Sequence, residues 1–157
     1  MPQGSEKNRD WPAVALFEEI VRSPQSRDDK LLAVCRLLVN RVAHYDWVGF
    51  YIAEPGCREL VLGPFVGAAT EHVRIPFGRG ICGQVAESEE TLVIQDVGAQ
   101  ENYLACSLAV QSEIVVPIFK NGKFRAELDI DSHRKAAFGD EDRILLEKIC
   151  ELVSAIF

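Results

Sequence analysis

The segment Lys120-Asn121-Gly122-Lys123 constrains the fold more than any other feature of this chain. An Asn-Gly pair between two runs of β-branched and aromatic residues is a strong signal for a two-residue hairpin turn. The sequence therefore predicts paired antiparallel strands over residues 113–119 and 124–130.

A second hairpin and several helices complete the predicted fold. Strands over residues 47–53 and 59–65 flank the turn Glu54-Pro55-Gly56-Cys57, and short strands are expected over residues 73–76 and 91–94. Apolar periodicity predicts helices over residues 11–21, 27–45 and 81–88, and a last helix beginning after Gly139. Because hairpins dominate, we expect an α+β fold with a central antiparallel sheet of five or six strands. The terminal helices should cover one face and the middle loops the other, all within one domain spanning residues 1–157.

Charge and hydropathy exclude several classes of function. The net charge is -7, and the longest basic run is His133-Arg134-Lys135, so no basic face for nucleic acid is expected. No apolar run approaches the ~20 residues that span a bilayer, and residues 1–10 lack a secretory signal. We therefore expect a cytoplasmic protein that binds neither membrane nor nucleic acid.

Five cysteines are present, with wide spacings and no C-x-x-C motif. The odd number and the spacing argue against a disulfide framework or a structural zinc site. Cys35 and Cys150 lie on or beside apolar helix stripes and are expected to pack in the core. Cys57 lies in a turn, where nothing nearby would activate it. Cys82 and Cys106 remain as candidates for chemistry.

Cys82 is placed at the start of a predicted helix, in Gly80-Ile81-Cys82-Gly83. Backbone N–H groups at a helix N-terminus favour a thiolate and lower its pKa, although a small packed residue would fit the same place. Cys106 lies in the long aperiodic segment 96–109, and long loops often carry function. His72 could orient or activate a thiol, or could be an ordinary surface histidine.

Three carboxylates and two aromatic residues are predicted to share one side of the sheet. Asp129 and Asp131 are two apart on one strand, and Glu113 opens the neighbouring strand. Such a cluster is stable if it faces water or if it holds a metal ion or an ammonium group. With no His or Cys spaced as further ligands, an amine is favoured over a metal. Trp47 and Tyr51 could wall a pocket for a methyl or thioether group, or could be core aromatics.

Several short segments occur in a characteristic order between residues 47 and 147. They are Trp47-Val48-Gly49-Phe50-Tyr51, Leu62-Gly63-Pro64-Phe65, Arg74-Ile75-Pro76, Gly78-Arg79-Gly80-Ile81-Cys82-Gly83, Ala105-Cys106, Ser112-Glu113-Ile114-Val115 and Leu128-Asp129-Ile130-Asp131-Ser132. Together they resemble the free methionine-(R)-sulfoxide reductases, which are stand-alone GAF domains. The resemblance implies the GAF fold and free methionine (R)-sulfoxide as substrate.

The same resemblance implies roles for individual residues. Cys106 would attack the sulfoxide sulfur and become a sulfenic acid, which a second cysteine resolves to a disulfide. The family commonly has a cysteine where this chain has His72, so Cys82 or an external thiol would be the resolving group. A thioredoxin-type protein would restore the dithiol, and no cofactor is implied.

The predicted pocket residues suit a free amino acid as the ligand. Glu113, Asp129 and Asp131 would hold its ammonium group, and Trp47 and Tyr51 its S-methyl end. GAF domains often pair through terminal helices, so the apolar stripe of the last helix would permit a homodimer. Two alternatives stay open: a GAF module that binds a small ligand or senses it without catalysis, and a cysteine redox sensor.

Overall fold

The structure is a computed structural model that describes residues 11–104 and 108–157. Its elements follow in the order α1 (Val14–Arg22), α2 (Arg27–Arg41), β1 (Trp47–Ala53), β2 (Glu59–Val66), β3 (Arg74–Pro76), α3 (Gly80–Ser88), β4 (Leu92–Ile94), η1 (Val97–Ala99), β5 (Ser112–Lys120), β6 (Lys123–Ser132), α4 (Asp140–Val153) and η2 (Ser154–Ile156). This order is the predicted one. The first helix begins three residues later than expected.

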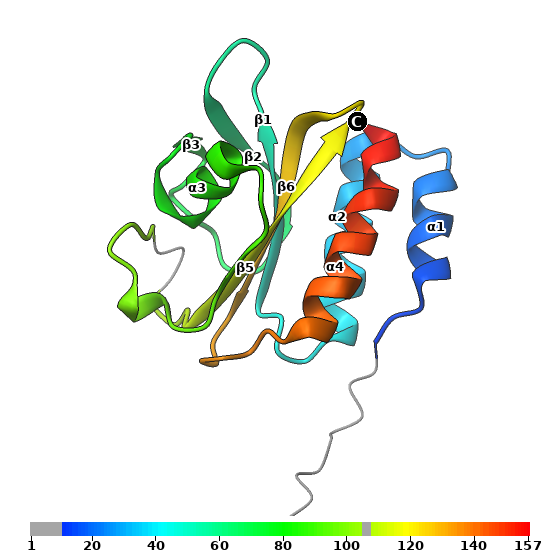
Figure 1. Cartoon of the computed structure of the whole chain (residues 1–157). Helices are drawn as coiled ribbons and strands as arrows, with labels where there is room; N and C mark the ends of the chain where they lie inside the picture. The colour runs from blue at the N-terminus through cyan, green and yellow to red at the C-terminus, as the bar shows by residue number, and fades with distance from the viewer. Residues whose placement is uncertain (1–10, 105–107) are drawn as a thin grey trace, which may run out of the picture.

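The sheet has six strands in the order β3-β2-β1-β6-β5-β4, each antiparallel to its neighbours. Figure 1 shows α1, α2 and α4 on one side of this sheet and α3 on the other. The predicted α+β class and the placement of the terminal helices are therefore confirmed. None of the helices in the described ranges has the length and apolar character needed to cross a bilayer.

The hairpin between β5 and β6 forms at the predicted turn. Asn121 and Gly122 have φ values of 53° and 75°, and a type I′ turn requires positive φ at both central residues. Beyond the turn, a β-bulge between Ile118 and Phe119 shifts the pairing by one residue, so Glu113 lies opposite Asp131 and Val115 lies opposite Asp129. The hairpin thereby places its acidic residues next to one another.

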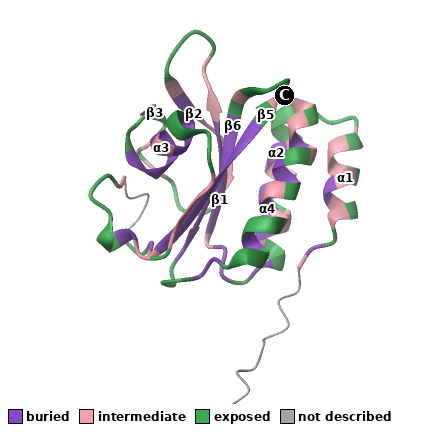
Figure 2. Cartoon of the chain, viewed as in Figure 1, coloured by how far each residue is buried: buried purple, intermediate pink, exposed green. Residues whose placement is uncertain are grey.

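Two hydrophobic cores lie on opposite faces of the sheet. Alternate residues of β6, among them Leu128 and Ile130, pack with the terminal helices in the larger core. The smaller core packs Tyr51 and Val115 from the sheet against residues of α3 such as Val85. Figure 2 shows the buried central strands between α3 on one side and α1, α2 and α4 on the other.

Cys35 and Cys150 are both buried in the larger core, which confirms the packing role predicted for them. The sequence predicts an apolar stripe on α4 formed by Leu145, Ile149, Leu152 and Ile156. The buried residues of α4 instead include Leu146, Ile149 and Val153, whereas Leu145 is only partly buried. Because this face packs within the chain, the dimer through the last helix stays a prediction.

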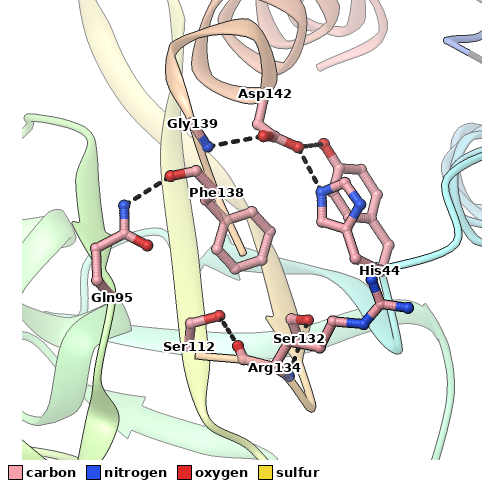
Figure 3. Close-up of polar contacts among 9 residues, drawn as sticks. His44, Gln95, Ser112, Ser132, Arg134, Phe138, Gly139 and Asp142 are labelled. Carbon is pink, nitrogen blue, oxygen red and sulfur yellow. Dashed lines mark hydrogen bonds and ion pairs between the residues drawn. The ribbon is translucent and has the colours of Figure 1, made fainter. Parts of the chain in front are cut away.

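A buried polar network ties the start of α4 to the end of α2. Asp142 is fully buried; its Oδ1 accepts a hydrogen bond from the Tyr45 hydroxyl and lies 2.8 Å from His44 Nε2. Its Oδ2 accepts a 2.8 Å bond from the Gly139 backbone N–H (Figure 3). The helix predicted over residues 27–45 ends at Arg41 because the residues that follow turn toward Asp142.

Candidate active site

A glycine turn shapes the N-terminus of α3. Gly78 and Gly80 have φ values of 89° and 65°, a conformation that favours glycine. A Cβ on Gly83 would lie 2.7 Å from the carbonyl oxygen of Pro76, so helix and turn are in close backbone contact. This packing places Cys82 in the first turn of α3, where it is 5% exposed and faces the smaller core.

Asn102, in the long segment 96–109, connects this segment to the same turn through hydrogen bonds. Its Oδ1 accepts a 2.8 Å hydrogen bond from the Gly80 N–H, and its Nδ2 donates a 2.8 Å bond to the Gly78 carbonyl. The side chain of Gln84 also donates to the backbone carbonyl of Asn102. Sequence reasoning missed this residue because its partners in the turn are backbone atoms, which leave no side-chain pattern to detect.

The three predicted carboxylates lie close together and away from water. Asp129 and Asp131 share the face of β6 that is turned toward α3, and Glu113 lies beside them on β5. Their exposed fractions are 4% for Glu113, 0% for Asp129 and 1% for Asp131. The alternative of a solvent-facing acidic strand is therefore wrong.

Glu127 is a fourth carboxylate on this face of the sheet. It is two residues before Asp129 on β6 and is fully buried. Sequence reasoning missed it, although the alternation Glu127, Asp129, Asp131 was a usable signal. Four buried acidic side chains on one sheet face are costly unless protons or a cation compensate their charge.

The thiol of Cys82 points into this carboxylate cluster. Its Sγ lies 3.3 Å from Asp129 Oδ2 and 3.9 Å from Glu113 Oε1. The Glu127 carboxyl is close enough to interact with the thiol, although neither of its oxygens has a hydrogen bond of good geometry. We name these four residues the thiol–carboxylate cluster: Cys82, Glu113, Glu127 and Asp129.

The cluster binds protons more tightly than isolated side chains would. Burial, followed by the negative charges of Asp129, Glu127 and Glu113, raises the pKa of the Cys82 thiol well above its usual value. The expected lowering by the helix N-terminus is wrong, because desolvation and three carboxylates outweigh the helix dipole. Burial also raises the pKa of Glu127 and of Asp129.

A small cavity lies between α3 and the sheet. Its volume is about 10 Å³, enough for about one water molecule. Four of the predicted site residues line it: Tyr51, Cys82, Glu113 and Asp129. A ligand of amino-acid size therefore needs some of the lining side chains to move.

Trp47 and Asp131 are not among the residues that line the cavity. The Trp47 ring stacks on Tyr51, with a centroid distance of 6.4 Å, and its indole N–H donates to the Ala68 carbonyl. Asp131 lies opposite Trp47 in the register of β1 and β6. Trp47 therefore packs against Tyr51, a residue of the cavity wall.

His72 and Leu104 also line the cavity. The backbone carbonyl of His72 accepts a 2.9 Å hydrogen bond from the Tyr51 hydroxyl. Cys106 follows Leu104 by two positions in the sequence but lies outside the described residues. Its role as nucleophile and its pairing with Cys82 stay predictions.

Comparison with known proteins identifies the fold. The GAF domain family matches residues 27–157 of the chain. Protein YtsP of Bacillus subtilis (strain 168) is 36% identical over 152 residues, which cover 95% of this chain and 91% of that protein. The antiparallel sheet with flanking helices is therefore a GAF fold, as the sequence predicted.

A solved structure shows which group of GAF proteins this chain resembles. Free methionine-R-sulfoxide reductase from Neisseria meningitidis, in complex with its substrate, is 35% identical and has a TM-score of 0.86. The match covers 90% of this chain and 84% of that one. The chain belongs to the free methionine-(R)-sulfoxide reductase family. Another member, from Escherichia coli (strain K12), is 42% identical over 106 residues, which cover 68% of this chain and 62% of that protein.

Membership of the free methionine-(R)-sulfoxide reductase family confirms the resemblance drawn from the short segments. Five of those segments lie around the cavity: they include β1 with Tyr51, the glycine turn with Cys82, and the β5–β6 hairpin with its carboxylates. The segments that carry the family likeness thus coincide with the site.

Proposed function

We propose that this protein is an oxidoreductase that reduces free L-methionine (R)-S-oxide to methionine. The observation that carries the proposal is the buried thiol–carboxylate cluster at a cavity, in a chain of this family. A free amino acid brings an ammonium group, and removing that group from water requires charged acceptors. Glu113, Asp129 and Asp131 are the acceptors in this proposal.

The same acceptors explain selection for the free amino acid. Methionine sulfoxide within a protein has a peptide nitrogen in place of the ammonium group, so it would leave buried carboxylates without a cationic partner. In this proposal Tyr51, backed by the stacked Trp47, contacts the S-methyl end of the substrate. Selectivity therefore comes from charge at one end and an apolar wall at the other.

In the proposed reaction the Cys106 thiolate attacks the sulfoxide sulfur. An S–S bond forms as the sulfoxide oxygen takes a proton. The resulting hydroxyl then moves to the Cys106 sulfur while the S–S bond and the substrate S–O bond break, so methionine leaves with an electron pair and Cys106 becomes a sulfenic acid. The departing oxygen needs a proton, and the raised pKa of Asp129 or Glu127 supports a protonated carboxyl as its donor. Substrate sulfur is reduced by two electrons and the cysteine is oxidised by two.

Cys82 resolves the sulfenic acid in this proposal. Its thiol forms the S–S bond with Cys106, and the sulfenic oxygen leaves as water after taking the thiol proton. Since the pKa of Cys82 is raised, the proton must first be accepted by a neighbour, and Asp129 Oδ2 at 3.3 Å is placed to take it. A thioredoxin-type dithiol then restores both cysteines, so no bound cofactor is needed. In this proposal the protein acts in the cytoplasm, where thioredoxin-type proteins keep thiols reduced.

The test is NADPH oxidation coupled through thioredoxin and its reductase, with each sulfoxide epimer supplied as free amino acid and as N-acetyl derivative. We expect turnover of the free R epimer alone. Cys106→Ser should abolish it, while Cys57→Ser, which changes an exposed cysteine, should retain it. Absence of turnover with both thioredoxin and dithiothreitol would refute the proposal and leave a ligand-binding or sensory module.

A further inference from the structure

The cluster beneath the cavity has the geometry of a small cation site. The Sγ of Cys82 and one carboxylate oxygen each from Glu113 and Asp129 all lie within 4.8 Å of one another. All three residues are buried and line the same cavity, whose volume of about 10 Å³ suits an ion better than an amino acid. We propose that Cys82, Glu113 and Asp129 bind a zinc ion.

The distances from the Cys82 sulfur to the two carboxylates fit tetrahedral zinc. With a Zn–S bond of ~2.3 Å and a Zn–O bond of ~2.1 Å, the Cys82–Asp129 distance of 3.3 Å corresponds to an S–Zn–O angle of about 100°. The Cys82–Glu113 distance of 3.9 Å corresponds to about 125° with the same bond lengths. These two angles bracket the tetrahedral value.

Glu127 provides independent support for a ligand at this place. It is fully buried, it interacts with the Cys82 thiol, and neither of its oxygens has a hydrogen bond of good geometry. The Oδ1 atom of Asp129 is likewise buried without a hydrogen bond. Burying carboxylate oxygens without hydrogen bonds costs free energy, and a bound cation would offset this cost.

The donor set selects the kind of cation. Magnesium and calcium prefer six or more oxygen ligands, often including water, which a cavity of this size does not supply. A thiolate with carboxylates suits a borderline-soft ion that accepts four ligands, and zinc is such an ion. Binding replaces the thiol proton, and any protons on the ligating carboxyls, with the metal; these protons pass to water.

Zinc at the cluster would inhibit the reductase; this consequence rests on the proposed function. The ion would use Glu113 and Asp129, which the substrate ammonium also needs, and would hold Cys82 as a bound thiolate. We therefore expect inhibition that is competitive with methionine sulfoxide and that a chelator reverses.

Cobalt(II) tests the site directly, because a thiolate bound to cobalt gives a charge-transfer band. The reduced, chelator-treated full-length protein should bind one equivalent of cobalt with such a band, and zinc should displace it. Cys82→Ser should lose the band, and Cys57→Ser should keep it. Glu127→Gln should weaken cobalt binding by about 10–100-fold, whereas Glu90→Gln, at an exposed glutamate, should leave it unchanged.

Failure to bind one equivalent of cobalt, or a band that persists in Cys82→Ser, would overturn the proposal. If Cys82→Ser does not fold, Asp129→Asn decides, because an unchanged cobalt affinity in that variant overturns it as well. These readouts do not involve catalysis. Metal binding without reductase activity would refute only the proposed function, and reductase activity without metal binding would refute only the zinc site.

Discussion

Glu127 provides the sharpest test of the energetics of the site. Burial raises its pKa in the folded protein well above the ~4.3 of an unfolded chain. A group with a raised folded pKa contributes its stability in full below the unfolded pKa. That contribution is lost as the pH rises toward the folded pKa. Glu127→Gln keeps the side-chain shape and removes this titration.

We therefore expect Glu127→Gln to be more stable than the parent protein at neutral pH. The difference in free energy of unfolding should grow by up to ~1.4 kcal/mol for each pH unit between the unfolded and folded pKa of Glu127. Urea unfolding from about pH 5 to about pH 8, in the presence of a reductant and a chelator, measures this difference.

The exposed residue Glu90 supplies the matched control, since Glu90→Gln should change stability by no more than ~0.5 kcal/mol and independently of pH. A Glu127→Gln difference that stays flat with pH would refute the reasoning. So would a variant that becomes less stable as the pH rises, because that would mean a charged Glu127 is stabilised by a partner.

Two further variants test the scaffold. Burial acts to raise the pKa of Asp142, but hydrogen bonds from His44, Gly139 and Tyr45 outweigh burial and lower that pKa. The charged Asp142 therefore stabilises the fold above pH ~3.9, and this stabilisation is lost as the pH falls through the folded pKa. Asp142→Asn should cost ~2–4 kcal/mol at neutral pH in urea unfolding and less in acid; an equal cost at both would contradict this. Gly83→Ala should lower Tm more than Gly122→Ala, because the first change creates a clash with backbone atoms and the second mainly strains φ. A larger drop in Tm for Gly122→Ala would contradict this reasoning.

Much of the fold could be predicted because local signals and packing agree. The turn at Asn121 and Gly122 joins β5 to β6, and the two-residue alternation along β6 separates core residues from acidic ones. The end of α2 could not be predicted, because it depends on Asp142, about a hundred residues further along the chain. Helical periodicity carries no information about such a contact.

Most residues of the candidate site could be predicted from the sequence, but their burial and pKa shifts could not. The alternation placed Asp129 and Asp131 on one face, yet only the packing of α3 shows that this face is buried. The pKa of Cys82 was expected to be lowered because the sequence shows its helix but not the surrounding carboxylates. Asn102 was missed because its importance depends on contacts with a distant turn, whereas the alternation along β6 could have pointed to Glu127.

Because side chains along β6 alternate between the two faces of the sheet, neighbouring residues differ in how freely they can be substituted. Leu128 and Ile130 are constrained by the larger core, whereas Asp129 lines the cavity on the opposite face of the sheet and can change without disturbing that core. A single nucleotide change at this acidic position could therefore alter what the cavity binds while the scaffold remains stable. One short hairpin thus offers a route by which relatives with this fold can diverge in ligand without first becoming unstable.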